Sequence, residues 1–238
     1  MPLPTWIEMS ALKIKTRHPM NPNNFVWVEK AMLLALRAWV VEGKEPPPST
    51  VPMISEGSLT PPESLRFPNI PGVSPPKWLY RVLRLDYGPE FAAKGIIANE
   101  PPKVGKAFPL LVPQVDEDGN ELAGLRMPAV SVPVATLTGW NLRHPDIGAP
   151  EQLSDMTGSF LPFPKTREQR ERSGDPRLSL EERYCDRDEY LGKYTKAAIG
   201  LMEKGYLLEE DLTGIILFGE KLWDAAVQAG NVEKRKTD

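Results

Sequence analysis

The sequence predicts a partial α/β fold, in which one long helix is followed by a small, mostly antiparallel patch of strands and a C-terminal helical region. Three observations predict it: apolar residues at helical spacing over about residues 23–42, apolar runs around an Asp-Gly turn between 77 and 140, and helix-capping motifs after 148. Strands and helices do not alternate as they do in a complete doubly wound sheet. We expect a single domain over residues 1–238.

The long helix is expected at about residues 23–42. Asn21-Pro22 provides a capping residue followed by proline at the first helical position, and Gly43 provides a C-terminal stop. The predicted sheet is small, so this helix has a longer apolar stripe than the remaining chain can cover. The stripe consists of Phe25, Val28, Met32, Leu36, Trp39 and Val40.

Strands are expected at residues 77–87, 108–115, 121–126 and 131–140. Trp78, Tyr80 and Val82 suit a strand in the first of these runs, and the last run is rich in valine and threonine. Residues 116–120, with the sequence DEDGN, separate two of these apolar runs. An Asp-Gly turn in that position is a strong signal for a hairpin.

The C-terminal region is expected to be helical. Thr166 with Gln169, and Ser179 with Glu182, have the spacing of capping boxes. A helix over about 190–202 is expected to end at Gly205, and a last helix covers about 212–227. Residues 1–20 are expected to be irregular and residues 230–238 to form a frayed tail.

The chain contains 26 prolines, about twice the usual fraction, concentrated in residues 46–76 and 101–164. Proline lacks an amide donor, so these stretches exclude long helices and central strands. Leucine, isoleucine, phenylalanine and tryptophan are interleaved with the prolines, which favours ordered, extended chain. Disorder is the alternative for residues 46–76.

Composition excludes several classes of function. A formal net charge of −3 gives no general attraction to nucleic acid, and no run of 18 apolar residues predicts a membrane span. Residues 1–10 lack the pattern of a signal peptide, and the sequence leaves the cellular compartment open. One cysteine, Cys185, and two histidines are a poor supply for a zinc site, so neither a metal nor a cofactor is expected.

Six strings resemble a bacterial family of alpha/beta hydrolase domain proteins, and together they extend from about residue 17 to about residue 227. The resemblance implies an α/β-hydrolase-like fold and an ester hydrolase, of which this chain is the C-terminal portion. In similar full-length proteins, the serine elbow and the catalytic histidine lie upstream of the Asn-Pro helix. The strings are MNPNNF (20–25), ALRAWVVEGKEPPPS (35–49), FPNIPGV (67–73), LVPQVDEDGNELAGLRMP (111–128), ATLTGWNLR (135–143) and GDPRLSLEERY (174–184).

A serine hydrolase of this fold needs a strained turn that exposes the serine hydroxyl, with the pattern Gly-x-Ser-x-Gly. The chain contains no such pattern. The nearest candidates are Ser58, Ser74 and Ser159, which lie beside glycines but do not link a buried strand to a helix. Each is interpreted as a turn or loop serine, and the chain is predicted to be inactive alone.

His18 and His144 are the candidate catalytic bases, because imidazole titrates near neutral pH. His18 lies close to where the family histidine is expected, but the surrounding glycine pattern is absent. His144 lies in a His-Pro-Asp loop. Exposure on a surface loop is the alternative for both, and neither has a triad to complete without a nucleophile.

Three further motifs have competing interpretations. Residues 116–120 resemble the start of a calcium loop, but the glycine is in the wrong position and a hairpin is favoured. Asp175 and Arg177 belong either to a ligand-binding constellation or to structural ion pairs near a capped helix, and the structural interpretation is favoured. Trp140 and Asn141 are candidate ligand contacts, and a strand end with a buried indole is an equal alternative.

Two hypotheses about function follow. In the first, the chain is part of a serine esterase that works only with an upstream hydrolase half. In the second, the chain is a non-enzymatic companion subunit or partner-binding module. Self-association of the chain alone through the 23–42 helix is also expected, because the apolar face of this helix lacks a cover.

Overall fold

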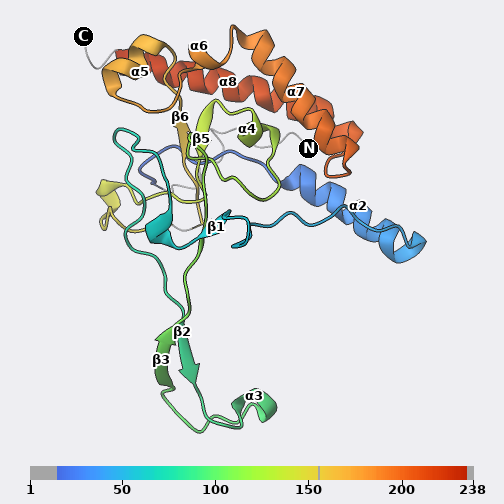
Figure 1. The fold of residues 1–238 in the computed structure, drawn as a ribbon, viewed down its shortest axis with the longest axis vertical. Coiled ribbons are helices and arrows are strands. Elements are labelled where there is room, and N and C mark those ends of the chain that lie inside the picture. The colour runs from blue at the N-terminus through green and yellow to red at the C-terminus, as the bar shows by residue number, and fades with distance from the viewer. Residues whose placement is uncertain (1–14, 155, 235–238) are drawn as a thin grey trace.

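The computed structural model describes residues 15–154 and 156–234 (Figure 1). The described residues contain seven α-helices and three two-stranded antiparallel sheets, β1–β4, β2–β3 and β5–β6. The α-helices are α2 (Val26–Glu42), α3 (Phe91–Lys94), α4 (Pro128–Ser131), α5 (Arg167–Ser173), α6 (Leu180–Arg183), α7 (Arg187–Glu203) and α8 (Leu212–Lys234). The 3-10 helices are η2 (Pro62–Ser64), η3 (Pro145–Ile147) and η4 (Glu209–Asp211). The strands are β1 (Leu59–Thr60), β2 (Leu83–Asp86), β3 (Lys103–Ala107), β4 (Val112–Pro113), β5 (Ala135–Leu137) and β6 (Phe160–Pro162).

The C-terminal helices confirm the capping motifs. The hydroxyl groups of Thr166 and Ser179 accept hydrogen bonds from the backbone amides of Gln169 and Glu182, and both reciprocal bonds of the capping boxes are present. These boxes satisfy amide donors that the first turn of a helix leaves unpaired. The helix predicted at 190–202 is α7, and Gly205 follows it with a left-handed φ of 83°.

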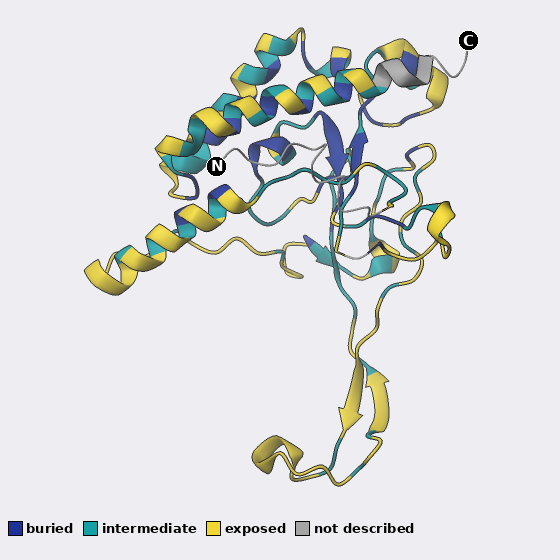
Figure 2. Cartoon of the chain, turned by 180° about the vertical axis from the view of Figure 1, so that it is seen from behind, coloured by how far each residue is buried: buried dark blue, intermediate teal, exposed yellow. Residues whose placement is uncertain are grey.

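The core lies between the antiparallel pair α7–α8 and the β5–β6 sheet, which the helices cover (Figure 2). Tyr190, Tyr194 and Ile215 are almost completely buried there. Gly219 allows the two helices to approach closely, because an added Cβ would lie 2.8 Å from the Tyr194 ring. Burial of such large side chains is the main stabilising contribution to this half of the molecule.

Residues 15–20 run beside the end of the β5–β6 sheet. Met20 forms an antiparallel bridge with Ser159, and Thr16 forms one with Arg143. The approach is close, because a Cβ on Gly158 would lie 2.0 Å from the carbonyl oxygen of Thr138. Only glycine fits this position without a shift of the backbone.

Helix α2 begins at Val26 and ends at Glu42, and Gly43 follows it as the left-handed C-cap with a φ of 71°. The predicted start at Asn21-Pro22 is wrong. The Asn21 side chain instead accepts from the amide of Asn23 and donates to the carbonyl of Thr138, so it fixes the preceding loop. Asn24 Oδ1 accepts from the amide of Val26 at 2.9 Å.

Only one end of α2 packs against the rest of the protein. Trp27 and Ala31 are buried, and the Trp27 ring meets Phe218 of α8 edge-on at 5.6 Å. The distal part extends away from the helical layer (Figure 1), and many of its apolar side chains are exposed. The exposed apolar residues are Leu33, Leu34, Leu36, Trp39, Val40 and Val41.

The strand predicted at residues 77–87 is reduced to β2. It pairs with β3, and the two strands form a hairpin that projects far from the core (Figure 1). All four residues of β2 are exposed. The prediction was too long because Trp78 and Tyr80, which favour strands by composition, have no paired strand beside them here and are 67% and 83% exposed.

The other predicted strands are also shorter than expected. Of residues 108–115 only β4 is a strand, and residues 121–126 contribute a single bridge, between Glu121 and Val115. Of residues 131–140 only β5 is a strand, because Pro128 at the first helical position starts α4, which extends through Ser131. The Asp-Gly turn itself is confirmed, since the amide of Gly119 donates to the carbonyl of Asp116.

The predictions for the ends of the chain are tested only in part. Residues 15–20 contain isolated bridges, and residues 1–14 lie outside the described part. Helix α8 continues to Lys234, beyond the predicted start of a frayed tail at residue 230, and residues 235–238 are not described. Residues 46–76 contain β1, η2 and short turns, and the rest of this stretch is neither helix nor strand. In the described part of the chain, no helix has the length and apolar character needed to cross a membrane.

Candidate functional site

The two candidate histidines lie at one surface depression. The backbone of residues 15–17 runs antiparallel to residues 142–144, with Arg17 N donating to the carbonyl of Leu142 at 2.8 Å and His144 N donating to that of Lys15 at 3.1 Å. This pairing places His18 next to His144 although 126 positions separate them in sequence. The depression is shallow, with a volume of about 430 Å³, and is lined by Lys15, Thr16, Arg17, His18, Pro19, His144 and Asp146.

His18 is half-buried, and desolvation together with the neighbouring Arg17 charge lowers its pKa. Both effects disfavour the imidazolium form. His18 is therefore largely neutral at neutral pH, the state in which an imidazole accepts a proton. Among the described residues, none forms a hydrogen bond with its imidazole.

His144 is held by the carboxylate of the loop that follows it. Its Nδ1 lies 3.2 Å from the amide of Asp146 and 3.3 Å from Asp146 Oδ2, and Lys15 Nζ lies 3.3 Å from the same oxygen. When Nδ1 accepts the amide proton, the neutral imidazole carries its proton on Nε2 and can only donate there. When Nδ1 is protonated and donates to Asp146, a neutral ring leaves Nε2 free to act as a base.

No described serine supplies a nucleophile to these histidines. Ser159 is fully buried and its hydroxyl donates to the carbonyl of Trp140 at 2.8 Å. The Ser58 hydroxyl bonds to the backbone of Met53, and Ser74 is exposed. In residues 15–154 and 156–234 there is no hydrogen bond between a serine hydroxyl and a histidine, so no catalytic triad is assembled there.

Asn141, a predicted ligand contact, is fully buried and its amide is occupied by the protein. Oδ1 accepts from the amides of His18 and Leu142, and Nδ2 donates to the carbonyls of His18 and Gly158. Trp140, the other predicted contact, is partly buried and packs on Phe67 with ring centroids 5.6 Å apart. A role for either in ligand binding stays a prediction.

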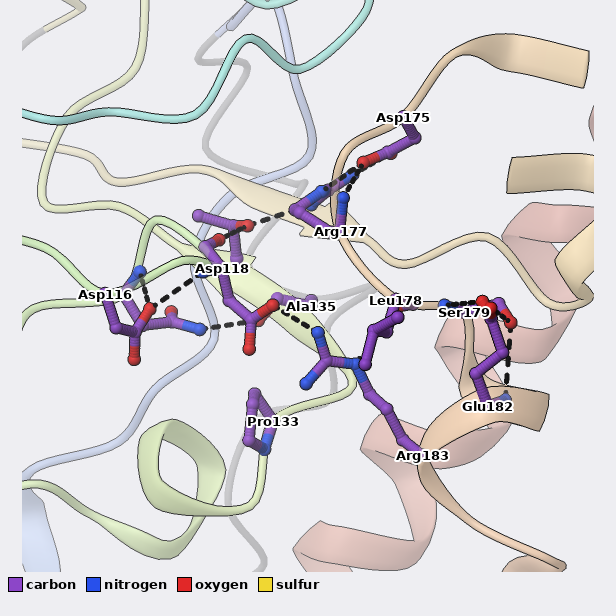
Figure 3. A network of polar contacts seen from close by, with 12 residues as sticks. Asp116, Asp118, Pro133, Ala135, Asp175, Arg177, Leu178, Ser179, Glu182 and Arg183 are labelled. Carbon is purple, nitrogen blue, oxygen red and sulfur yellow. Dashed lines mark hydrogen bonds and ion pairs between the residues drawn. The ribbon is translucent and has the colours of Figure 1, made fainter. Parts of the chain in front are cut away.

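The charged string at residues 174–184 forms a structural network of ion pairs (Figure 3). Arg177 and Asp175 are buried and joined through two nitrogens, with NH2 2.6 Å from Asp175 Oδ2. The remaining Arg177 donors bond to the Thr136 hydroxyl and to the carbonyls of β6. Arg183 pairs with Asp118. The partners of both arginines are therefore protein groups, which agrees with the structural interpretation.

Residues 116–120 form a tight turn that is closed by the side chain of Asp116. Asp116 Oδ1 accepts from the amides of Asp118 and Asn120, which closes the turn. Gly119 has a φ of 80° and contacts Phe67 and Thr136 so closely that a side chain would require a shift. Among the described residues, no group of three histidine, cysteine, aspartate or glutamate side chains is arranged to hold a metal ion.

A second pocket, of about 160 Å³, was not predicted from the sequence. It lies between the loop before α2, the segment after the Asp-Gly turn and the end of β5. Its lining residues come from two stretches of sequence about 100 positions apart, and only one of them is acidic, so no local motif marks the pocket. They are Asn21, Asn23, Glu121, Ala123, Leu125, Arg126, Val130, Leu137 and Gly139.

The fold and these sites define a partial α/β protein with a histidine-lined depression and no assembled nucleophile in its described part. The model of the alpha/beta hydrolase domain family matches residues 5–216, which is most of the chain. The protein belongs to this family. Comparison of this chain with curated proteins and with solved structures found no match.

Proposed function

We propose that the chain is the C-terminal portion of an α/β-hydrolase-type serine esterase and is inactive without the upstream half. The observation that carries the proposal is the depression that His18 and His144 share: it contains a neutral imidazole that can accept a proton but no serine. A hydroxyl nucleophile needs such a base within hydrogen-bonding reach. In this proposal, a segment outside the described residues supplies the nucleophile.

The exposed surface of α2 supports a missing half. A broad apolar face on a helix is normally buried, yet Leu33, Val40 and Val41 of α2 are each at least 67% exposed. Burial of these side chains would contribute about 1.5–3 kcal/mol each. An upstream α/β sheet is a surface of the right kind to cover them.

The activity test compares the chain alone with the chain plus an upstream half. A short-chain nitrophenyl ester measures turnover, and a serine-directed phosphonate measures covalent labelling. We expect neither from the purified chain. Robust turnover with labelling by the chain alone would refute the proposal.

The source of the upstream half can be identified from the DNA directly before the coding region. An in-frame segment with a Gly-x-Ser-x-Gly elbow would supply the half to be co-expressed. Restored turnover with that half supports the esterase proposal, and His18→Gln then tests the base. An intergenic region with its own promoter and ribosome site would count against truncation.

The alternative function is a non-enzymatic companion or partner-binding module. The projecting β2–β3 hairpin favours it, because Tyr80, Val82 and Val104 are more than half exposed there. Apolar surface of this extent is common at interfaces. Failure of any hydrolase half to restore turnover, together with stable binding of a protein without a serine elbow, would favour this function.

A further inference from the structure

We propose that the pocket between Asn23, Glu121 and Arg126 binds a small neutral molecule with adjacent hydroxyl groups, such as a polyol or the edge of a sugar. Asn23 lies about 100 positions before the segment that contains Glu121 and Arg126, so the pocket exists only in the folded chain. This pocket is separate from the histidine-lined depression and shares no lining residue with it.

Two buried polar atoms of the lining residues have no hydrogen-bond partner among the described residues. They are Asn23 Oδ1, an acceptor, and Arg126 Nε, a donor. Folded proteins satisfy the great majority of such groups, because an unpaired one costs the free energy of its lost hydration. A ligand in the pocket that both accepts and donates hydrogen bonds would satisfy them.

The Glu121 carboxyl adds a third unpartnered group. It forms no hydrogen bond or ion pair within the described part of the chain, and Oε1 lies 3.6 Å from where a Cβ on Gly139 would be. The residue as a whole is exposed, but the pocket wall partly desolvates the carboxyl group and raises its pKa. Glu121 therefore offers acceptor oxygens to the pocket that it lines.

The charges of the pocket select a neutral ligand. Arg126 is already paired, since NH2 donates to Asp116 Oδ2 at 2.8 Å and to the carbonyl of Val130 at 3.1 Å. An anionic ligand would meet the unpaired Glu121 carboxylate, and a cationic ligand would meet the Arg126 guanidinium. A hydroxyl group both donates and accepts, so adjacent hydroxyls can bond to acceptors and donors together.

The size and the apolar part of the lining agree with this class. Leu125, Val130 and Leu137 give the pocket an apolar wall that suits the C–H groups of a polyol. An engineered cavity of about 150 Å³ holds benzene, a molecule of six heavy atoms, so about 160 Å³ accommodates glycerol. We expect weak binding, with a Kd of roughly 1–100 mM for a ligand of this size.

The test is an NMR titration of the full ¹⁵N-labelled chain with glycerol, followed at the Asn23 side-chain amide and at Arg126 Nε–H. Local signals are needed because polyols stabilise many proteins by exclusion from the surface, so a higher Tm would not identify a site. We expect saturable shifts at both groups. Glycolate and ethylammonium, at matched ionic strength, should bind at least tenfold more weakly.

Two variants separate a binding site from a structural pocket. Asn23→Leu removes the unpartnered oxygen without loss of any side-chain hydrogen bond, and Glu121→Leu removes the carboxyl group. Each should weaken glycerol binding at least tenfold. Glu117→Leu is the matched control, because Glu117 is exposed in the same turn, outside the pocket.

The proposal is wrong if the shifts do not saturate, if glycolate or ethylammonium binds more tightly than glycerol, or if both pocket variants bind glycerol as the unmodified chain does. An amide probe, acetamide, tests the class directly. Tighter binding of acetamide than of glycerol would overturn the assignment to hydroxyl groups. None of these outcomes depends on esterase activity.

Discussion

The side chain of Asn141 forms two hydrogen bonds with the backbone of His18. Nδ2 donates to the His18 carbonyl at 2.9 Å, and Oδ1 accepts from the His18 amide at 3.2 Å. The same amide group bonds to the backbone of Leu142 and Gly158. One buried side chain thus joins three segments and fixes the position of His18 relative to His144.

Asn141→Ala should lower the free energy of unfolding by about 2–4 kcal/mol, because it leaves buried amide and carbonyl groups unpaired. Urea unfolding measures this change. Hydrogen exchange at the Arg17 amide, which donates to Leu142, should accelerate as residues 15–18 detach. Asn99→Ala removes a single exposed bond from Nδ2 to the Asp86 carbonyl and should cost under about 0.5 kcal/mol. Equal losses from the two variants would contradict the role of Asn141.

Arg177→Met should destabilise the fold by about 3–5 kcal/mol, because it leaves the buried Asp175 carboxylate without its partner. It also removes the donors to the Thr136 hydroxyl and to the carbonyls of β6. Chemical denaturation gives the magnitude. Arg172→Met is the control in the same segment, since Arg172 is exposed and has no ion pair among the described residues. A loss below 1 kcal/mol for Arg177→Met would show that the pair is not buried in solution.

The stability of the helical region should fall in acid through Glu182. Hydrogen bonds from the Ser179 amide and hydroxyl, and then from Arg170, lower the pKa of Glu182 from 4.5 to about 2. A carboxyl with a lowered folded pKa contributes stability above pH 4.5 and loses it as the pH falls toward 2. Unfolding free energies measured from pH 6 to pH 2 should therefore decline less steeply for Glu182→Gln.

Glu168→Gln serves as the control for the acid dependence. Glu168 is exposed in the first turn of α5 and forms no ion pair with any described residue. Its profile should follow that of the unmodified chain. Parallel profiles for the Glu182 and Glu168 variants would show that the capping box does not hold an ionised carboxylate.

Local chemistry explains which parts of the fold were predictable. The capping boxes at Thr166 and Ser179 and the turn at Gly119 depend on residues within a few positions, so the sequence indicates them directly. The strands do not depend on neighbouring residues in this way. Strand pairing depends on partners far along the chain, and the sequence could not show that β2 pairs with β3 or that β1 pairs with β4.

The candidate sites show the same division. His18 and His144 were identified by their chemistry, but their shared depression depends on backbone pairing between residues 15–17 and 142–144. The pocket at Asn23 was not predicted, because its residues are ordinary by type and become notable only through unpaired buried atoms. These unpaired atoms can be recognised only in the folded structure.

Association of the purified chain should depend on the exposed part of α2. Leu33 and Val40 are 67% and 76% exposed, and an apolar surface of this extent associates in water. Light scattering at tens of micromolar should give a mass above the 26.6 kDa of one chain. The double substitution Leu33→Glu with Val40→Glu places charges in the contact and should raise the dissociation constant at least tenfold. Leu217→Glu on α8, a residue 50% exposed, is the control and should leave association unchanged. A compact monomer of the unmodified chain at high concentration would show that α2 is not an association surface.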